Sequence, residues 1–133
     1  MISSFITFNN TKARAENVEP YASVAQVENH SVTVTPPFDS SAKITINYKL
    51  RRTITAYDER LTFDSYTSAS VPSGYSLTVL EPMKASGSSS NMDANKYLTL
   101  NVSYNVYKNG VYKGSVAVTI RYHLNTSPTV TFG

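Results

Sequence analysis

The chain has 133 residues and a mass of 14.6 kDa, the size of one domain with its own hydrophobic core. It has no cysteine, only 16% charged residues, and many serine (18), threonine (15) and asparagine (11) residues. These figures exclude a disulfide framework, a coiled coil and a disordered chain, and they favour an all-β domain. A net charge of +3 allows a nucleic-acid partner without requiring one.

The N-terminal residues 1–6 show neither the basic region nor the apolar run of a signal peptide. No apolar stretch approaches the ~18 residues of a membrane span. We therefore expect a protein that is made in the cytoplasm and has no membrane partner, or else a numbering that begins after processing.

Residues 1–30 carry the weakest pattern. Residues 5–8 suggest a short strand, and residues 21–27 fit a strand, although Val24 and Val27 also fit one helical turn. We place His30 in a loop, because the alternation resumes only at residues 31–35 and then stops at two prolines.

The clearest element covers residues 43–57, where mostly apolar even positions alternate with polar odd positions. This period predicts a long, half-buried strand. Arg52 interrupts the apolar set, so we expect a bend or bulge there, or a place where that face leaves the core. A four-residue loop at residues 57–60 would then pair Ala56 with Leu61 and Ile54 with Phe63.

Residues 97–124 predict a second long hairpin around Asn109-Gly110. A three-residue loop at 108–110 keeps the apolar residues on one face, whereas a two-residue loop mixes the faces. The predicted partners are Val106 with Tyr112, Val102 with Val116, Leu100 with Val118, and Tyr104 with Gly114.

Between the hairpins, residues 75–80 predict a strand and residues 81–95 a loop. The Ser-Gly-rich residues 86–91 are expected to bury nothing and to be mobile. Residues 127–133 suggest a last short strand or an extended arm. The whole chain, 1–133, thus predicts one antiparallel β domain, a single sheet or a sandwich, with about seven to nine strands, little or no helix and extended N- and C-terminal segments.

Candidate catalytic groups are sparse. The two histidines are far apart in sequence, and we interpret both as ordinary surface residues. The neighbouring acids Asp58 and Glu59 are typical of a solvated hairpin tip, and neither a phosphate-binding glycine loop nor a nucleophile elbow occurs. We therefore predict no enzyme, no catalytic residue, no metal, no cofactor and no small-molecule substrate.

The remaining feature is a basic polar face without acids. Lysine and arginine can neutralise phosphates, hydroxyl and amide groups can hydrogen-bond them, and tyrosines can stack on bases. The alternative is a solvated polar surface, and the interpretation depends on whether the two hairpins share one sheet. The candidate nucleic-acid-binding residues are Lys43, Thr45, Asn47, Lys49, Arg51, Thr53 and Thr55 on the first long strand, with Lys113 and Arg121 on the second hairpin.

A short, cysteine-free chain with long strands and this composition resembles a bacteriophage virion structural protein. Its basic polar face is similar to the RNA-facing sheet of the coat proteins of small single-stranded RNA phages. The resemblance implies a self-assembling coat subunit with Thr45 to Thr55 on the nucleic-acid side. Those coat proteins end in two helices, whereas residues 97–133 predict strands, so a second sheet would cover the apolar face or the family would be different.

The expected function is therefore that of a non-enzymatic capsid or coat subunit, located in the virion. Its partners would be further copies of itself and single-stranded nucleic acid. Two alternatives stay open. One is a capsid decoration or tail protein. The other is a carbohydrate-binding or adhesin β-sandwich, in which exposed tyrosines (Tyr66, Tyr75 and Tyr107) would replace the missing tryptophan.

Overall fold

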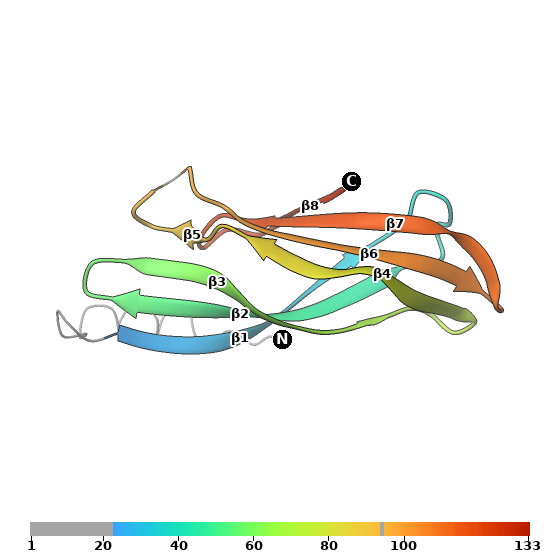
Figure 1. Cartoon of the computed structure of the whole chain (residues 1–133), viewed down its shortest axis with the longest axis horizontal. Coiled ribbons are helices and arrows are strands. Elements are labelled where there is room, and N and C mark those ends of the chain that lie inside the picture. Colours follow the sequence, from blue (N-terminus) through green and yellow to red (C-terminus); the bar gives the residue numbers. More distant parts are fainter. Residues whose placement is uncertain (1–22, 94) are drawn as a thin grey trace.

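Two antiparallel sheets of four strands each pack face to face in the computed structural model, which describes residues 23–93 and 95–133 (Figure 1). This confirms the all-β prediction in its sandwich form. The first sheet, sheet A, has the order β1-β2-β3-β5, with β1 at Ser23–Val34, β2 at Ile44–Thr55, β3 at Glu59–Ser70 and β5 at Ser89–Ser90. The second, sheet B, has the order β4-β6-β7-β8, with β4 at Tyr75–Ser86, β6 at Leu98–Lys108, β7 at Val111–Tyr122 and β8 at Thr129–Phe132.

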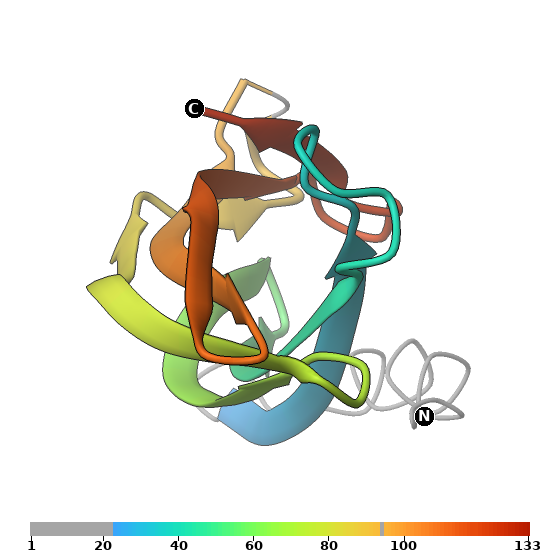
Figure 2. The same ribbon diagram turned by 90° about the vertical axis from the view of Figure 1, so that its right-hand side faces the viewer.

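The chain forms sheet A first and then crosses to sheet B. Strands β1, β2 and β3 follow one another as a meander, and β4 begins sheet B after a turn at residues 71–74. The chain then returns briefly to the edge of sheet A as β5 before β6, β7 and β8 complete sheet B. Figure 2, which looks along the strands, shows both sheets wrapped around one interior.

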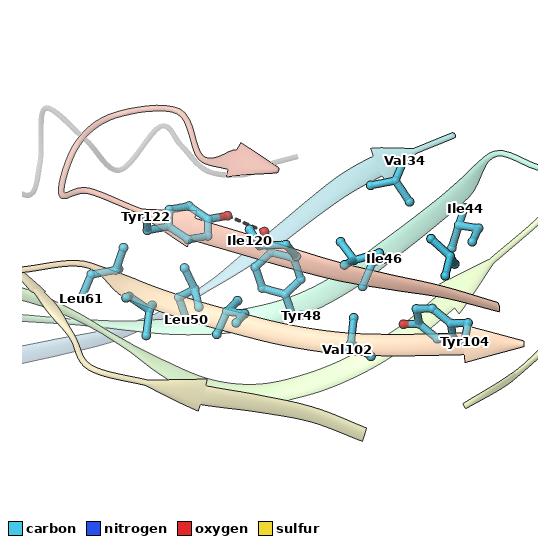
Figure 3. Packing of buried hydrophobic residues seen from close by; sticks show 14 of the residues in the cluster. Val34, Ile44, Ile46, Tyr48, Leu50, Leu61, Val102, Tyr104, Ile120 and Tyr122 are labelled. Atoms are coloured by element: carbon cyan, nitrogen blue, oxygen red, sulfur yellow. Dashed lines mark hydrogen bonds between the residues drawn. The ribbon is translucent and has the colours of Figure 1, made fainter. Parts of the chain in front are cut away.

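The core lies between the sheets and follows the period-two pattern of the long strands. Every even position of β2 from Ile44 to Ile54 is buried, and β6 and β7 contribute a matching set (Figure 3). The largest fully buried side chains are Tyr48 and Tyr104. Sequence periodicity therefore predicts which faces of these strands are buried.

Strand β1 is longer and more regular than predicted. It runs without a break from Ser23 to Val34, and all of its residues pair with β2 without a register shift. The helical alternative at Val24 and Val27 and the loop at His30 are therefore wrong, since His30 lies opposite Tyr48 within the ladder. The strand predicted at residues 5–8 lies outside the described residues.

The β2–β3 hairpin has a tighter turn than predicted. The Thr55 N–H donates to the Asp58 carbonyl at 2.8 Å, and the Thr55 hydroxyl accepts from the Asp58 N–H at 2.9 Å. Ile54 consequently pairs with Glu59 and Leu50 with Phe63, which corrects the predicted register. The expectation that apolar residues pair with apolar residues is wrong here, because Glu59 faces inward, toward the guanidinium of Arg52.

The β6–β7 hairpin has a two-residue turn at Asn109-Gly110. The sequence had favoured a three-residue loop, because a two-residue loop would mix polar and apolar residues on one face. Asn109 and Gly110 both have positive φ (49° and 80°), and Lys108 pairs with Val111. A bulge opposite Val106 and Tyr107 absorbs one residue, which restores the apolar faces. The predicted partners are therefore wrong: Leu100 pairs with Ile120, Val102 with Val118, Tyr104 with Val116 and Val106 with Gly114.

Residues 81–95 are more ordered than a mobile loop. Strand β4 continues to Ser86, and Ser89 and Ser90 are buried as β5. The Ser90 hydroxyl donates to an Asp58 carboxylate oxygen at 2.7 Å and accepts from the Met92 N–H at 3.0 Å, whereas the buried Ser89 hydroxyl has no hydrogen-bond partner among the described residues. Of the two endings considered, the structure has the short strand, because β8 pairs with β7. In the part of the chain that the structure describes, no helix is long and apolar enough to cross a membrane.

Gly114 is expected to be sensitive to a side chain because the Phe38 ring covers it. A Cβ added at Gly114 would lie 2.9 Å from the nearest atom of that ring. Gly114→Ala is therefore expected to lower the free energy of unfolding by about 1 kcal/mol through overpacking. Urea denaturation measures this, with Phe38→Ala as the control background, in which the same substitution should cost less because only the backbone strain at a φ of 158° remains. An equal cost in both backgrounds would contradict the contact.

Candidate nucleic-acid interface

The outer surface of sheet A carries most of the predicted interface. The odd-numbered residues of β2 face away from the core and lie between outward residues of β1 and β3. We call this surface the sheet A face. Its members include Asn29, Ser31 and Thr33 of β1, Thr45, Asn47, Lys49, Arg51, Thr53 and Thr55 of β2, and Arg60, Thr62, Ser68 and Ser70 of β3, with Lys43 just before β2.

Hydroxyl and amide groups link the strands of this face. The Thr33 and Thr45 hydroxyls are 3.1 Å apart, and the Asn47 amide donates to the Ser68 hydroxyl at 3.4 Å. These contacts are exposed, so the groups remain accessible to a ligand as well. The face therefore offers a polar, hydrogen-bonding surface rather than an apolar one.

The charges on the sheet A face are only partly free. The Arg51 guanidinium lies 3.2 Å from the Asp64 carboxylate, and Arg60 lies 3.0 Å from Asp58. Asp64 of β3 and Asp58 of the β2–β3 turn thus bring acids next to a strand that has none, which corrects the expectation of an acid-free face. Neither Lys43 nor Lys49 forms an ion pair with any residue in the described ranges.

Lys113 and Arg121 lie on sheet B and do not join this face. Lys113 occupies the bulge of β7, and Arg121 pairs with Thr99 and Thr129 in sheet B. The Arg121 guanidinium is 5.5 Å from the centre of the Tyr97 ring, a cation–π contact. Because the sheets pack through their inner faces, the two groups of predicted residues belong to opposite outer faces of the sandwich.

The tyrosines are not placed to stack bases on the sheet A face. Tyr48, Tyr104 and Tyr122 are buried. Two of the tyrosines proposed as exposed sugar contacts already form hydrogen bonds within the protein. The Tyr66 hydroxyl lies 3.0 Å from the Tyr104 hydroxyl, and the Tyr75 hydroxyl donates to the Asp39 carboxylate at 2.7 Å. Those two and Tyr107 are half-buried, which corrects that expectation. Nucleic acid would therefore meet this face mainly through its phosphates.

A buried ion cluster lies directly beneath the face and was missed by sequence reasoning. Arg52 is only 2% exposed, and its guanidinium donates to both carboxylate oxygens of Glu28 at 2.7 and 3.3 Å. It also donates to Glu59 at 2.7 Å and to the Asn125 side-chain oxygen at 3.1 Å. Arg52 therefore neither leaves the core nor sits at a bulge: the bulges of this hairpin are in β3, opposite residues 47–50 of β2.

The cluster continues as a chain of rings that joins the two sheets. The His30 ring lies 3.1 Å from the Glu28 carboxylate through Nε2 and 3.4 Å from the Tyr122 hydroxyl through Nδ1. The Tyr122 hydroxyl in turn bonds that of Tyr48 (Figure 3). His30 is thus not an ordinary surface histidine. With a neutral His30, every donor in this chain has an acceptor: Tyr48 donates to Tyr122, Tyr122 to His30, and His30 to Glu28.

Burial and hydrogen bonding pull the ionisation of this cluster in opposite directions. Burial raises the pKa of Glu28, but bonds from His30 and Arg52 and the Arg52 charge outweigh it and lower the pKa to about 2. Burial alone would lower the pKa of Arg52, whereas Glu28 and Glu59 raise it. Burial also raises the pKa of Tyr122 to about 12. Glu28 and Arg52 are therefore both charged at neutral pH.

One signal in the sequence points to this cluster. Arg52 stands alone among the apolar even positions of its strand, and such a residue needs an opposite charge if it stays buried. Identifying Glu28 as the partner of Arg52 requires the β1–β2 register, and the residues that connect the two strands do not indicate that register.

No known protein family, curated protein or solved structure matches the chain. Within residues 23–93 and 95–133, no group of three or more histidine and carboxylate side chains is placed to hold a metal ion.

Proposed function

We propose that the protein is a non-enzymatic, self-assembling structural subunit of a virus particle and that its sheet A face contacts nucleic acid. The observation that carries this proposal is the sheet A face, where Lys43 and Lys49 lack carboxylate partners and lie among accessible hydroxyl and amide groups. Phosphate groups attract such unpaired ammonium groups and accept hydrogen bonds from hydroxyls and amides.

The spacing along β2 suits a repeating anionic ligand. Outward side chains on a strand recur roughly every 6.7 Å, and the outward positions of β2 form one row along the strand, with Lys49 and Arg51 at adjacent places. Because the exposed tyrosine of sheet A, Tyr57, lies in the β2–β3 turn and not on the face itself, recognition would depend mainly on phosphates and not on base identity. Such binding is independent of sequence and strongly dependent on salt.

Long edge strands support self-assembly. In the strand order of the described residues, β1 and β4 are 12-residue strands at the sheet edges. Edge strands present backbone hydrogen-bonding groups that a second chain can pair with. Copies of the same chain are therefore the first partner we propose, and the virion is the proposed location.

The double variant Lys49→Ser and Arg51→Ser is expected to lose nucleic-acid binding. Fluorescence anisotropy with a labelled single-stranded RNA of mixed sequence, titrated at several salt concentrations, measures this. If both cations contact phosphate, the slope of log K against log salt should become shallower by about 1.4.

The matched control is Lys113→Ser with Arg121→Ser, which removes two cations from sheet B. We expect this control to bind RNA like the wild-type protein, apart from the small effect of net charge. Equal losses in both double variants would contradict the assignment to the sheet A face. If the wild-type protein does not bind RNA at all, the nucleic-acid role is wrong, and a decoration or tail protein becomes the better proposal.

A further inference from the structure

One edge of the sandwich is built differently from the others. Strand β1 forms the rim of sheet A, and no described strand pairs with its outer edge (Figure 1). The strand contains no proline, and every residue of it pairs with β2 without a register shift. Such an edge presents an uninterrupted row of backbone N–H and C=O groups to another strand. The side chains that it turns outward are exposed and uncharged: Ala25, Val27, Asn29, Ser31 and Thr33.

The other edges carry features that hinder the addition of a strand. Strand β4 has two register shifts, exposes Glu81 and Lys84, and contains Pro82, which has no N–H to donate. Strand β3 has two bulges, and the first half of β7 has one, with the exposed Lys113. The edges at β5 and β8 are only two and four residues long. Proline, bulges, charges and short strands all protect an edge from pairing. Among the described strands, β1 alone lacks these features.

We propose that β1 pairs with β1 of a second copy of the chain, antiparallel and about a two-fold axis. This inference rests on the proposed self-assembly and identifies its contact. A partner for such an edge must itself present a regular, uncharged edge, and the described chain offers one such strand, β1 itself. A two-fold contact uses the same surface on both copies, which meets this condition. Sheet A would then continue without interruption from one subunit into the next.

The charge of Glu28 selects the register of this contact. The two-fold axis keeps both inner faces on the same side, so inward residues must lie opposite inward residues. Two such registers overlap along nearly the whole strand, one centred on Glu28 and the other on Asn29. The first places two Glu28 carboxylates directly opposite each other, which is unfavourable. The second places Glu28 opposite His30 of the partner subunit and Val24 opposite Val34 of the partner subunit. We therefore assign the axis to Asn29.

Cysteine cross-linking tests both the edge and the register. The chain has no cysteine, so introduced thiols report the contact without background. Asn29→Cys places a thiol on the axis, where Cα atoms directly opposite each other are about 4.5–5.5 Å apart, within the span of a disulfide. Under oxidation by air with a copper catalyst, most of this variant should form a covalent dimer on a non-reducing gel.

The matched controls are Val27→Cys and Ser31→Cys, which lie on the same outward row. In the assigned register each lies opposite the other residue and not opposite its own copy. Each single variant should therefore stay mainly monomeric on the gel, whereas the double variant Val27→Cys and Ser31→Cys should form the covalent dimer. Equal cross-linking of all three single variants would contradict the register.

A second pair of variants tests the contact without a covalent bond. Val27→Lys places a charge on the β1 edge at a residue that is 46% exposed, and it should raise the dissociation constant of the assembly at least tenfold. Leu80→Lys, at a residue of β4 that is 50% exposed, should assemble like the wild-type protein. Sedimentation velocity over a range of concentrations measures both, and unfolding midpoints show whether a loss is caused by misfolding.

The outcomes separate this contact from the self-assembly on which it rests. Wild-type protein that stays monomeric at every concentration would overturn the self-assembly itself. Wild-type protein that assembles while Asn29→Cys forms no covalent dimer would overturn only the β1 contact. Weaker assembly of Leu80→Lys than of Val27→Lys would assign the contact to β4 instead.

Discussion

Replacing Arg52 with methionine is expected to lower the free energy of unfolding by about 3–5 kcal/mol. The substitution keeps the length of the side chain but leaves the carboxylates of Glu28 and Glu59 without their shared cation. Glu28 is buried, so its charge would be desolvated with only His30 and Gln26 as hydrogen-bond partners. Urea denaturation followed by circular dichroism measures the loss.

The neighbouring residue provides the control. Arg51 lies on the outer face, its side chain is 47% exposed, and its ion pair with Asp64 is expected to contribute less than about 1 kcal/mol. Arg51→Met should therefore be nearly neutral. Equal effects at positions 51 and 52 would contradict the burial of the ion cluster. In the triple variant Glu28→Gln, Arg52→Met and Glu59→Gln, much of the lost stability should return, because no unpaired charge remains.

Acid is expected to remove about 3 kcal/mol of stability through Glu28 alone. Its pKa is about 2 in the folded protein, below the ordinary value of 4.5. The depressed pKa means that the folded state favours the ionised carboxylate. This contribution is therefore complete above about pH 4.5 and is lost as the pH falls toward about 2.

The measurement is the free energy of unfolding of the wild-type protein and of Glu28→Gln at a series of pH values. The variant cannot titrate at this position, so the advantage of the wild-type protein should shrink as the pH falls through this range. Asp64→Asn, which removes a half-exposed acid paired with Arg51, is the control and should show little change. A wild-type advantage that is constant with pH would contradict the role of Glu28.

The faces of the long strands could be predicted from the sequence, but their pairing could not. Alternation placed Ile44, Ile46 and Leu50 in the core because a strand turns its side chains to opposite sides at every residue. Pairing depends instead on bulges and turn length. The bulge near Gly114 allowed the two-residue Asn109-Gly110 turn to restore the apolar faces, and the Thr55–Asp58 bonds shortened the other turn.

The candidate site could also be predicted only in part, because the sequence indicates which way a side chain faces but not which strands lie side by side. The alternating pattern correctly predicted that Lys49 and Arg51 face away from the core, since their neighbours Tyr48 and Arg52 are buried. Sequence reasoning could not show that Lys113 and Arg121 belong to the other sheet, because sheet membership depends on long-range pairing. It also missed Asp64 beside Arg51, since that contact joins β2 to β3.

The central proposal is that this chain assembles and packages nucleic acid, and size-exclusion chromatography with light scattering tests it most directly. The column should be monitored at the absorbance maxima of both nucleic acid and protein. The account predicts a particle of megadalton mass whose absorbance is dominated by nucleic acid. A peak with the mass of one to a few subunits and the spectrum of pure protein would contradict it.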